Sequence, residues 1–391
     1  MRISQRLGRV KPSATLTISA KAAELKSQGK KIVSLSVGEP DFQTPEHVCA
    51  AARKAIDEGF TRYTAVPGIP ELRQAAAGYF NGFYDARAES KDIIITNGGK
   101  QSLYELFQAL VNPGEKVLIP APYWVSYPAM VLLAEGEPAF IPAPAEKGYK
   151  VTPEDLEAVH DPAVKVLLLN SPSNPTGVHY TREELYALAE WAIDRDVFVI
   201  SDEIYDRLVY PPAEPVSLCE LWKKRPEMVA VVNGLSKSFA MTGWRLGYTL
   251  AHEDLIKAMS KIQGQSTSNV CSIAQKAALA ALNGPFDLLD EMCEAYARRR
   301  DLAMDIVTSW DRAVCPEPDG AFYVFVDVSA YYREGMADST ELCTRLLDEA
   351  GVAAVPGAAF GDDNCVRFSY ALDDESLKSG LTAAGKVITG S

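Results

Sequence analysis

Short apolar runs alternate with helical patterns through the middle of the chain. The runs are continuously apolar rather than alternating with polar positions, and they fall at residues 93–95, 117–119, 164–169, 197–200 and 229–232. Helical periodicity, for example over 101–110 and 182–193, separates them. Strands that are apolar on both sides belong to sheets covered on both faces, which are mainly parallel. We therefore predict an α/β fold with a mostly parallel sheet, whose functional groups lie beyond the carboxyl ends of its strands.

The two ends of the chain predict a second, smaller α+β unit. Near the amino terminus we expect a helix over 20–25, a strand over 32–37 and a second helix that begins at Pro45. Beyond residue 285 we expect a long helix over 286–310, followed by a strand at 321–326 and a helix at 340–349. Two further strands, at 352–355 and 366–370, and a final helix at the carboxyl terminus complete the pattern. The basic run 298–300 is expected on the solvated face of the long helix. Neither end has much core of its own, so we expect them to pack together.

This pattern divides the chain into three segments. Residues 1–45 form an amino-terminal arm and the first part of a small domain, 46–285 a large domain, and 286–391 the carboxyl-terminal small domain. A chain of 391 residues exceeds the usual size of one domain, which agrees with this division.

Composition excludes some functions. The formal net charge of −13 argues against binding to nucleic acid or to an anionic membrane. Seven cysteines and four histidines stand singly, without the spacing of a metal site, and the cysteines read as reduced core thiols of a cytoplasmic protein. No signal peptide and no membrane span is recognisable. We therefore expect a cytoplasmic protein without a metal.

The stretch 233–248 carries the first candidate chemistry. Lys237 lies between two serines after the apolar run 229–232, and Arg245 follows in a second apolar stretch. A lysine at a strand end among small residues can form a Schiff base with an aldehyde cofactor. Ser236 and Arg245 suit the oxygens of a phosphate group. The alternative is a loop with a solvated lysine.

Three other strand ends carry polar groups. The run 96–100 has two glycines before a helix, an arrangement that lets backbone amides approach an anion, although a simple glycine turn is the alternative. Asp202 is a carboxylate that could pair with a protonated pyridine nitrogen, or merely cap a helix. Tyr205 and Asn174 could each hydrogen-bond the phenolate oxygen of such a ring, whereas Asn174 could also be only a turn residue.

Further candidates are less specific. Trp124 offers a flat face for stacking on an aromatic ring, or a core side chain. Arg367 is a lone cation in an apolar strand; such an arginine usually points to solvent or to a salt bridge, yet a guanidinium also binds a carboxylate in a bidentate manner. Tyr63 is uninformative by itself.

Together these motifs resemble the class I aminotransferases, pyridoxal-phosphate enzymes of fold type I. More narrowly, the chain is similar to the bacterial aspartate aminotransferase branch that includes prephenate aminotransferases. The resemblance covers nearly the whole chain. It rests on the ordered motifs K-P-S-A-T, G-E-P-D-F, Y-T-A-V-P-G-I-P-E-L-R, G-G-K-Q, P-Y-W-V-S-Y, N-S-P-S-N-P-T-G, S-D-E-I-Y, S-K-S-F-A-M-T-G-W-R-L-G-Y and V-R-F-S-Y-A.

The resemblance implies roles for particular residues. Lys237 would bind the cofactor as a Schiff base and shuttle a proton, with Asp202 and Tyr205 as the other catalytic residues. The cofactor-binding set would be Gly99, Lys100, Trp124, Asn174, Asp202, Tyr205, Ser236, Lys237, Arg245 and, from the other subunit of a homodimer, Tyr63. The substrate-binding set would be Gly38, Lys100, Trp124, Asn174, Arg367, Lys11 and Thr15.

The implied reaction is a ping-pong transfer of an amino group. Aspartate or glutamate would be the donor and 2-oxoglutarate or oxaloacetate the acceptor, and Lys11 and Thr15 match residues associated with prephenate as an additional acceptor. The partners would be small amino acids and 2-oxo acids, not nucleic acid or membrane. Two other classes remain open: a lyase or an aminotransferase of different specificity on the same fold, and a non-catalytic regulator built on it.

Overall fold

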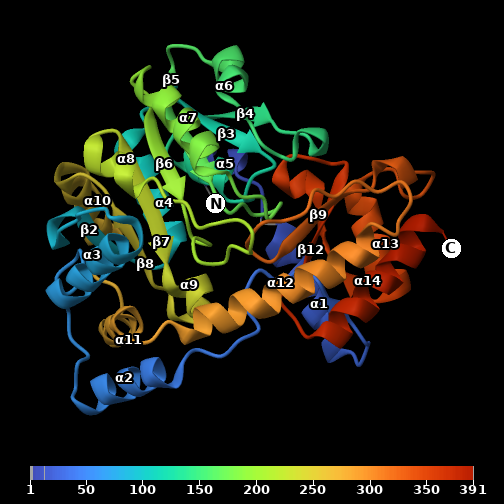
Figure 1. Ribbon diagram of the computed structural model, residues 1–391, viewed down its shortest axis with the longest axis horizontal. Coiled ribbons are helices and arrows are strands. Elements are labelled where there is room, and N and C mark those ends of the chain that lie inside the picture. Colours follow the sequence, from blue (N-terminus) through green and yellow to red (C-terminus); the bar gives the residue numbers. More distant parts are fainter. Residues whose placement is uncertain (1–2, 13, 391) are drawn as a thin grey trace.

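The structure, a computed structural model, describes residues 3–12 and 14–390. Its elements form a large and a small layered part, and the long helix α12 (Asp287–Val307) runs from one to the other (Figure 1). A seven-stranded sheet organises the large part, and a three-stranded and a two-stranded sheet lie in the small part. The mainly parallel α/β architecture predicted from the apolar runs is confirmed, whereas the boundaries at residues 45/46 and 285/286 remain a prediction.

The large sheet has seven strands in the order β2-β8-β7-β6-β5-β3-β4. In chain order these are β2 (Ile93–Thr96), β3 (Lys116–Ala121), β4 (Glu137–Pro142), β5 (Val164–Asn170), β6 (Phe198–Asp202), β7 (Val229–Gly234) and β8 (Gly247–Leu250). The strands from β4 across to β7 are parallel, and β8 is antiparallel to both of its neighbours. The carboxyl ends of β5, β6 and β7 therefore meet at one edge.

Strand β4 and the direction of β8 are findings that the apolar runs did not indicate. The two prolines of β4 mask its pattern, and proline is tolerated there because β4 is the edge strand, where one row of amides is unpaired. The connection between β7 and β8, residues 235–246, contains two short helical segments and brings the chain back antiparallel.

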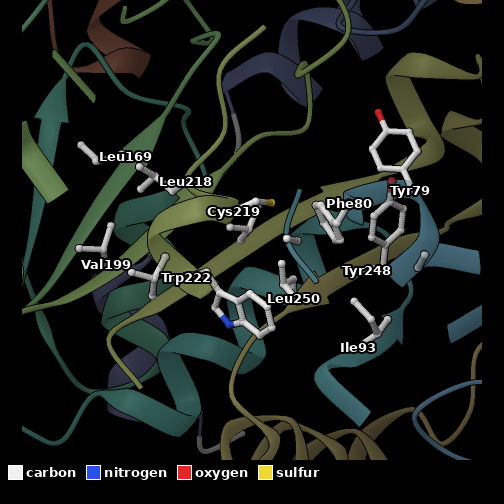
Figure 2. Packing of buried hydrophobic residues seen from close by; sticks show 14 of the residues in the cluster. Tyr79, Phe80, Ile93, Leu169, Val199, Leu218, Cys219, Trp222, Tyr248 and Leu250 are labelled. Carbon is white, nitrogen blue, oxygen red and sulfur yellow. The ribbon is translucent and has the colours of Figure 1, made fainter. Parts of the chain in front are cut away.

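Helices cover both faces of the large sheet, since alternate residues of one strand enter different cores. Ile93 and Ile95 belong to one apolar cluster and Ile94 to another. The first cluster contains α3 (Pro70–Tyr84), α7 (Arg182–Ile193), α8 (Cys219–Lys224) and α11 (Ser272–Asn283), together with residues of α2 (Glu46–Asp57) and α6 (Pro153–Val159). Figure 2 shows its packing, with Phe80 and Tyr248 side by side and Trp222 below Cys219. The second contains α4 (Gly99–Leu110), α5 (Tyr127–Leu133) and α10 (Glu253–Ser266).

The small part combines both ends of the chain, as predicted. Its antiparallel sheet has the order β11-β12-β9, from β9 (Tyr323–Asp327), β11 (Val355–Pro356) and β12 (Cys365–Ser369). Strand β1 (Val33–Ser34), shorter than expected, pairs in parallel with β10 (Val352–Ala353). Helices α1 (Ala14–Ser27), α13 (Ser339–Ala350) and α14 (Asp374–Thr389) complete it. The pairing of β1 with β10 joins segments more than 300 positions apart.

The prediction that the basic run 298–300 lies on a solvated face is wrong. Only Arg298 is exposed, whereas Arg299 and Arg300 are buried. The Arg299 guanidinium lies between the carboxylates of Asp41, 2.9 Å away, and Asp374, 3.1 Å away. Opposite charges on the amino-terminal segment and on α14 make burial of this cation tolerable. Arg299 therefore ties the loop at residues 38–42 to the small part.

Two further expectations from composition concern the cysteines and the membrane-spanning helices. All seven cysteines are free, but only Cys219, Cys343 and Cys365 are buried and Cys271 is exposed, so the description as core thiols holds for some of them. Within residues 3–12 and 14–390, no helix is both long and apolar enough to cross a membrane.

Candidate active site

A cavity of about 570 Å³ lies where the carboxyl ends of the large sheet face the small sheet. Most of the residues selected from the sequence line it, although they come from segments far apart in the chain. The lining residues are Thr15, Ser36, Val37, Gly38, Glu39, Gly99, Lys100, Leu103, Trp124, Tyr127, Asn170, Asn174, Asp202, Ile204, Tyr205, Ser236, Lys237, Thr242, Arg245, Tyr323 and Arg367. The position at the strand ends agrees with the rule for α/β sheets.

Lys237 is carried by the short helix α9 (Leu235–Ser238), directly after β7. Its ammonium group donates to the Gly38 carbonyl oxygen. Burial lowers the pKa of Lys237 from 10.5 to about 8, with Arg367 and Arg245 acting in the same direction and Glu39 opposing them. An amine with this pKa is partly neutral near pH 8, so it can act as a nucleophile and as a base.

Asp202 ends β6 at the floor of the cavity and caps no helix, because β6 is followed by a turn. One carboxylate oxygen accepts from the Tyr127 hydroxyl at 2.6 Å, and the other from the Ile204 amide at 3.3 Å. Burial raises the pKa of Asp202 to about 6, while the Tyr127 hydrogen bond and Lys237 oppose that rise. A buried carboxylate without a neighbouring cation at contact distance suits a ligand that brings a positive N–H.

The start of α4 and Arg245 together line one part of the cavity with hydrogen-bond donors that suit an anion. The Arg245 guanidinium donates to the carbonyl oxygens of Thr242 and Asn97, at 2.9 and 3.2 Å. A Cβ at Gly98 would lie 2.5 Å from its Nη2 atom, so glycine is required for this approach. Helix α4 then directs its first amides, including that of Gly99, toward the cavity. The two glycines are thus more than a turn.

Arg367 is a cation held inside the protein. It is only 2% exposed, and it donates to the Asn174 side-chain oxygen at 2.8 Å and to the Ser36 carbonyl oxygen at 2.9 Å. Its Nε atom has no hydrogen-bond partner, and no carboxylate of the described residues forms an ion pair with it. Burial lowers its pKa, with Tyr323 and Tyr205 opposing. Neither solvent nor an internal salt bridge satisfies this charge, which suits an incoming carboxylate.

The orientation of Asn174 follows from that contact. Because its side-chain oxygen accepts from Arg367, only its amide N–H groups remain to donate into the cavity. Tyr205 is buried and also lines the cavity, and its hydroxyl lies 2.9 Å from the Tyr323 hydroxyl. Asn174 and Tyr205 therefore each bring a hydrogen-bond donor to the same cavity.

Lys100 and Trp124 form the outer wall. The Lys100 ammonium lies over the Trp124 ring, 4.8 Å from its centre. Desolvation, and repulsion from Arg245, lower the pKa of Lys100. The edge of the Trp124 ring is held against Tyr127, at 5.3 Å between ring centres. This arrangement leaves a cation at the mouth and a flat aromatic group beside the floor.

Two predicted residues do not belong to the cavity of this chain. Lys11 is exposed and absent from the lining, unlike Thr15 of the same motif. Tyr63 is 90% exposed and also lies outside the cavity.

Reasoning from the sequence missed Tyr127, Tyr323 and Glu39, all of which line the cavity. Tyr127 and Glu39 stand in the motifs P-Y-W-V-S-Y and G-E-P-D-F, which was a usable signal. Tyr323 lies in an ordinary apolar strand, where nothing distinguishes it from core residues. No cluster of potential metal ligands occurs among the residues that the structure describes.

A lysine of lowered pKa, a buried carboxylate, an anion site and a buried unpaired arginine define a site for amino-group chemistry on a carboxylic acid. The family model described as aminotransferase class I and II matches residues 30–383, and the chain belongs to that family. It is an aminotransferase, and its relatives and structural neighbours confirm the predicted fold type and reaction class.

The relatives have similar names. An aspartate/prephenate aminotransferase from Cereibacter sphaeroides is 46% identical over 383 residues, covering 96% of both chains. An aspartate aminotransferase from Bacillus subtilis is 41% identical and covers 97% of both. The structure of aspartate aminotransferase from Thermus thermophilus with maleate is 43% identical, has a TM-score of 0.94 and covers 99% of this chain and 100% of that one.

Proposed function

We propose that this aminotransferase uses pyridoxal 5′-phosphate to transfer the amino group of aspartate or glutamate to 2-oxoglutarate or oxaloacetate in a ping-pong reaction. The observation that carries the proposal is the union of Lys237, Asp202 and Arg367 in one cavity. Lys237 is an amine whose pKa is lowered by burial. Among the described residues, Asp202 is a buried carboxylate without an ion-pair partner, and Arg367 is a buried cation without a carboxylate partner. A pyridine aldehyde with an amino acid bound to it would supply a carbonyl group, a ring N–H and a carboxylate to these three groups.

The residues present fit this cofactor. Asp202 would hold its ring nitrogen, Asn174 and Tyr205 its phenolate oxygen, and Trp124 its ring face. Its phosphate group would bind to Arg245, Ser236 and the backbone amides of Gly99 and Lys100. When bound, the cofactor supplies an electron sink that stabilises negative charge at the substrate α-carbon.

The side chains of the protein then have defined tasks. Arg367 binds the α-carboxylate and so orients the α-hydrogen, helped by the neighbouring Gly38 backbone and Asn174. The Lys237 amine, with a pKa of about 8, would take that proton at its Nζ atom and pass it on within the same half of the reaction, so that it is neutral again and can carry a proton in the opposite direction in the second half. Asp202 would favour a proton on the ring nitrogen, because a carboxylate stabilises a cationic partner.

A dicarboxylic substrate is supported by Lys100. Its ammonium lies over Trp124 in the same cavity as Arg367, and neither group is neutralised by a side-chain carboxylate of the described residues. Two separate cations suit two carboxylates at the ends of one short acid. The names of the relatives from Bacillus subtilis and Thermus thermophilus point to the same substrate.

Prephenate is a second candidate acceptor. It is supported by Thr15, which lines the cavity, and by the name of the Cereibacter sphaeroides relative. Lys11, the other residue associated with this acceptor, would have to move toward the cavity or act from its rim. A coupled assay with glutamate and prephenate tests this candidate directly.

The assembly would be a homodimer in the cytoplasm. The exposed Tyr63 ring would be buried against the neighbouring subunit, where its hydroxyl reaches that subunit's phosphate site. An aromatic ring that is 90% exposed in the single chain supports such an exchange, because tyrosines are enriched at interfaces. The division at residues 45 and 285 belongs to the same proposal, with the small domain carrying Arg367.

The test is the visible spectrum of the purified protein, with pyridoxal phosphate added if required, during separate titrations with L-aspartate, L-glutamate and L-alanine. We expect a yellow absorbance band that aspartate and glutamate abolish at far lower concentration than alanine. A band abolished preferentially by alanine contradicts the dicarboxylate assignment. The absence of any band after cofactor addition contradicts the cofactor and the mechanism.

Variants sharpen the result. Lys237→Ala should abolish transamination, and near-normal turnover in that variant contradicts its role. Lys100→Met should reduce the preference for aspartate over alanine by about tenfold, since one charge-assisted contact is lost. Lys150→Met is the matched control, because Lys150 pairs with Glu184 outside the cavity. It should leave the preference unchanged.

A further inference from the structure

Tyr323 occupies a junction between the two halves of the site. It lies on β9, in the small sheet, yet its hydroxyl is 2.9 Å from the hydroxyl of Tyr205, which follows β6 of the large sheet. The Arg367 guanidinium stacks on its ring, 4.4 Å from the ring centre. A Cβ at Gly38 would lie 3.1 Å from its hydroxyl oxygen, so the backbone that contacts Lys237 also packs there.

Counting protons fixes the direction of the contact between the two hydroxyls. Each tyrosine hydroxyl has one proton to donate. Burial raises the pKa of both Tyr205 and Tyr323, so both stay protonated at neutral pH. If Tyr205 donates its proton to a ligand in the cavity, it can only accept from Tyr323. The opposite arrangement would leave Tyr205 without a proton for the ligand.

We propose that Tyr323 is a positioning residue with two separable parts. Its ring holds the Arg367 guanidinium in place for the substrate carboxylate, and its hydroxyl donates to Tyr205 so that the Tyr205 proton points into the cavity. This inference rests on the proposed function, because Tyr205 donates its proton into the cavity only if an acceptor atom of the cofactor is bound beside it.

The chain of donors has a measurable electronic effect. A hydroxyl that accepts a hydrogen bond becomes a better donor, so Tyr323 strengthens the bond from Tyr205 to the cofactor oxygen. A stronger donor withdraws charge from that oxygen. It therefore lowers the basicity of the neighbouring nitrogen, the one through which Lys237 would be bound to the cofactor. The charged groups facing the tyrosine pair are Arg367 on β12, Asp202 on β6 and Lys237 on α9, and two further titratable groups, Tyr127 and Tyr370, also interact with it. None of these changes in a Tyr323→Phe variant.

Two substitutions separate the two parts. Tyr323→Phe keeps the ring against Arg367 and removes only the hydroxyl, whereas Tyr323→Leu removes both. Tyr149→Phe is the matched control, because the Tyr149 hydroxyl donates to the backbone oxygen of Phe325 on the same strand and Tyr149 lies outside the cavity. Phe325 is also the strand partner of Arg367, so the control tests general disturbance of this sheet.

Three quantities are measured on the purified holoenzymes: the pH midpoint of the visible absorbance change, the dissociation constant of succinate as a substrate-shaped dicarboxylate, and kcat. For Tyr323→Phe we expect the midpoint to rise by about half a pH unit and kcat to fall about threefold to tenfold, with succinate binding within about twofold of wild type. For Tyr323→Leu we expect succinate binding to weaken about tenfold in addition. Tyr149→Phe should change none of them.

The outcomes are distinct. A Tyr323→Phe enzyme with the wild-type midpoint and kcat refutes the donor role, and equal succinate binding in the Phe and Leu variants refutes the role of the ring. The same changes in Tyr149→Phe would show a general disturbance of the sheet and refute both. A wild-type protein without a visible band overturns the proposed function itself, whereas a normal wild-type band with unaltered variants overturns only this inference.

Discussion

We expect the ionised Asp202 carboxylate to lower the free energy of unfolding of the cofactor-free protein, although the same carboxylate would serve catalysis once the cofactor is bound. The substitution Asp202→Asn preserves the shape of the side chain and leaves an oxygen that still accepts from Tyr127, whose hydroxyl is 2.6 Å away. It removes the ionisable group. The prediction concerns the protein before cofactor is added, so it tests the electrostatics of the site separately from its chemistry.

The magnitude follows from the shifted pKa. Burial raises the pKa of Asp202 from its usual 3.8 to about 6. Between these two values the folded protein binds more protons than the unfolded chain, so the free energy of unfolding falls as the pH rises, and it stays lowered above pH 6. A shift of about two units corresponds to about 3 kcal/mol. Asp202→Asn should therefore raise the stability at pH 8 by about 2–3 kcal/mol and leave it nearly unchanged at pH 4.

The assay is urea unfolding of both cofactor-free proteins at several pH values, with the free energy of unfolding compared between them. The difference between the two proteins cancels the titration of groups that they share. Addition of pyridoxal phosphate should reverse the order, since the wild-type carboxylate pairs with the ring nitrogen and stabilises the bound state.

An Asp202→Asn protein that is less stable than wild type at pH 8 would refute this reasoning. So would a stability difference that does not depend on pH, because a change in packing alone has no reason to follow the titration of one carboxyl group. Either result would mean that Asp202 is well solvated or paired in the folded protein.

Two further predictions use the same electrostatics. The rate of reconstitution of the cofactor-free protein with pyridoxal phosphate should rise with pH and level off above about pH 8, because Lys237 must be neutral to react; a rise continuing toward 10.5 would mean an ordinary lysine. Arg299→Gln should lower the free energy of unfolding by about 2 kcal/mol, since it leaves Asp41 without its ion-pair partner and Asp374 with only the exposed Arg298. The control is Arg298→Gln, whose side chain is 61% exposed and should cost less than about 1 kcal/mol; equal losses would contradict the difference in burial.

Much of the large part could be read from the sequence, because its signals are local. Strands covered on both faces need continuous apolar runs, and those runs located β2, β3, β5, β6 and β7. A polar residue that directly follows such a run lies at a strand end, which is why Asp202 and Lys237 could be selected before any contact was known. The ordered motifs then identified the aminotransferase family.

Only the tertiary structure decided which of these groups meet and in what environment. Arg367 and Asn174, 193 positions apart, share a hydrogen bond, and the burial of Arg367 without a carboxylate partner cannot be read from a strand pattern. The same holds for Arg299, whose neighbours Asp41 and Asp374 come from both ends of the chain. Local sequence determines periodicity and strand ends because these depend on nearest neighbours. Burial and pKa depend on desolvation and charge from distant segments, and these exist only once the chain has folded.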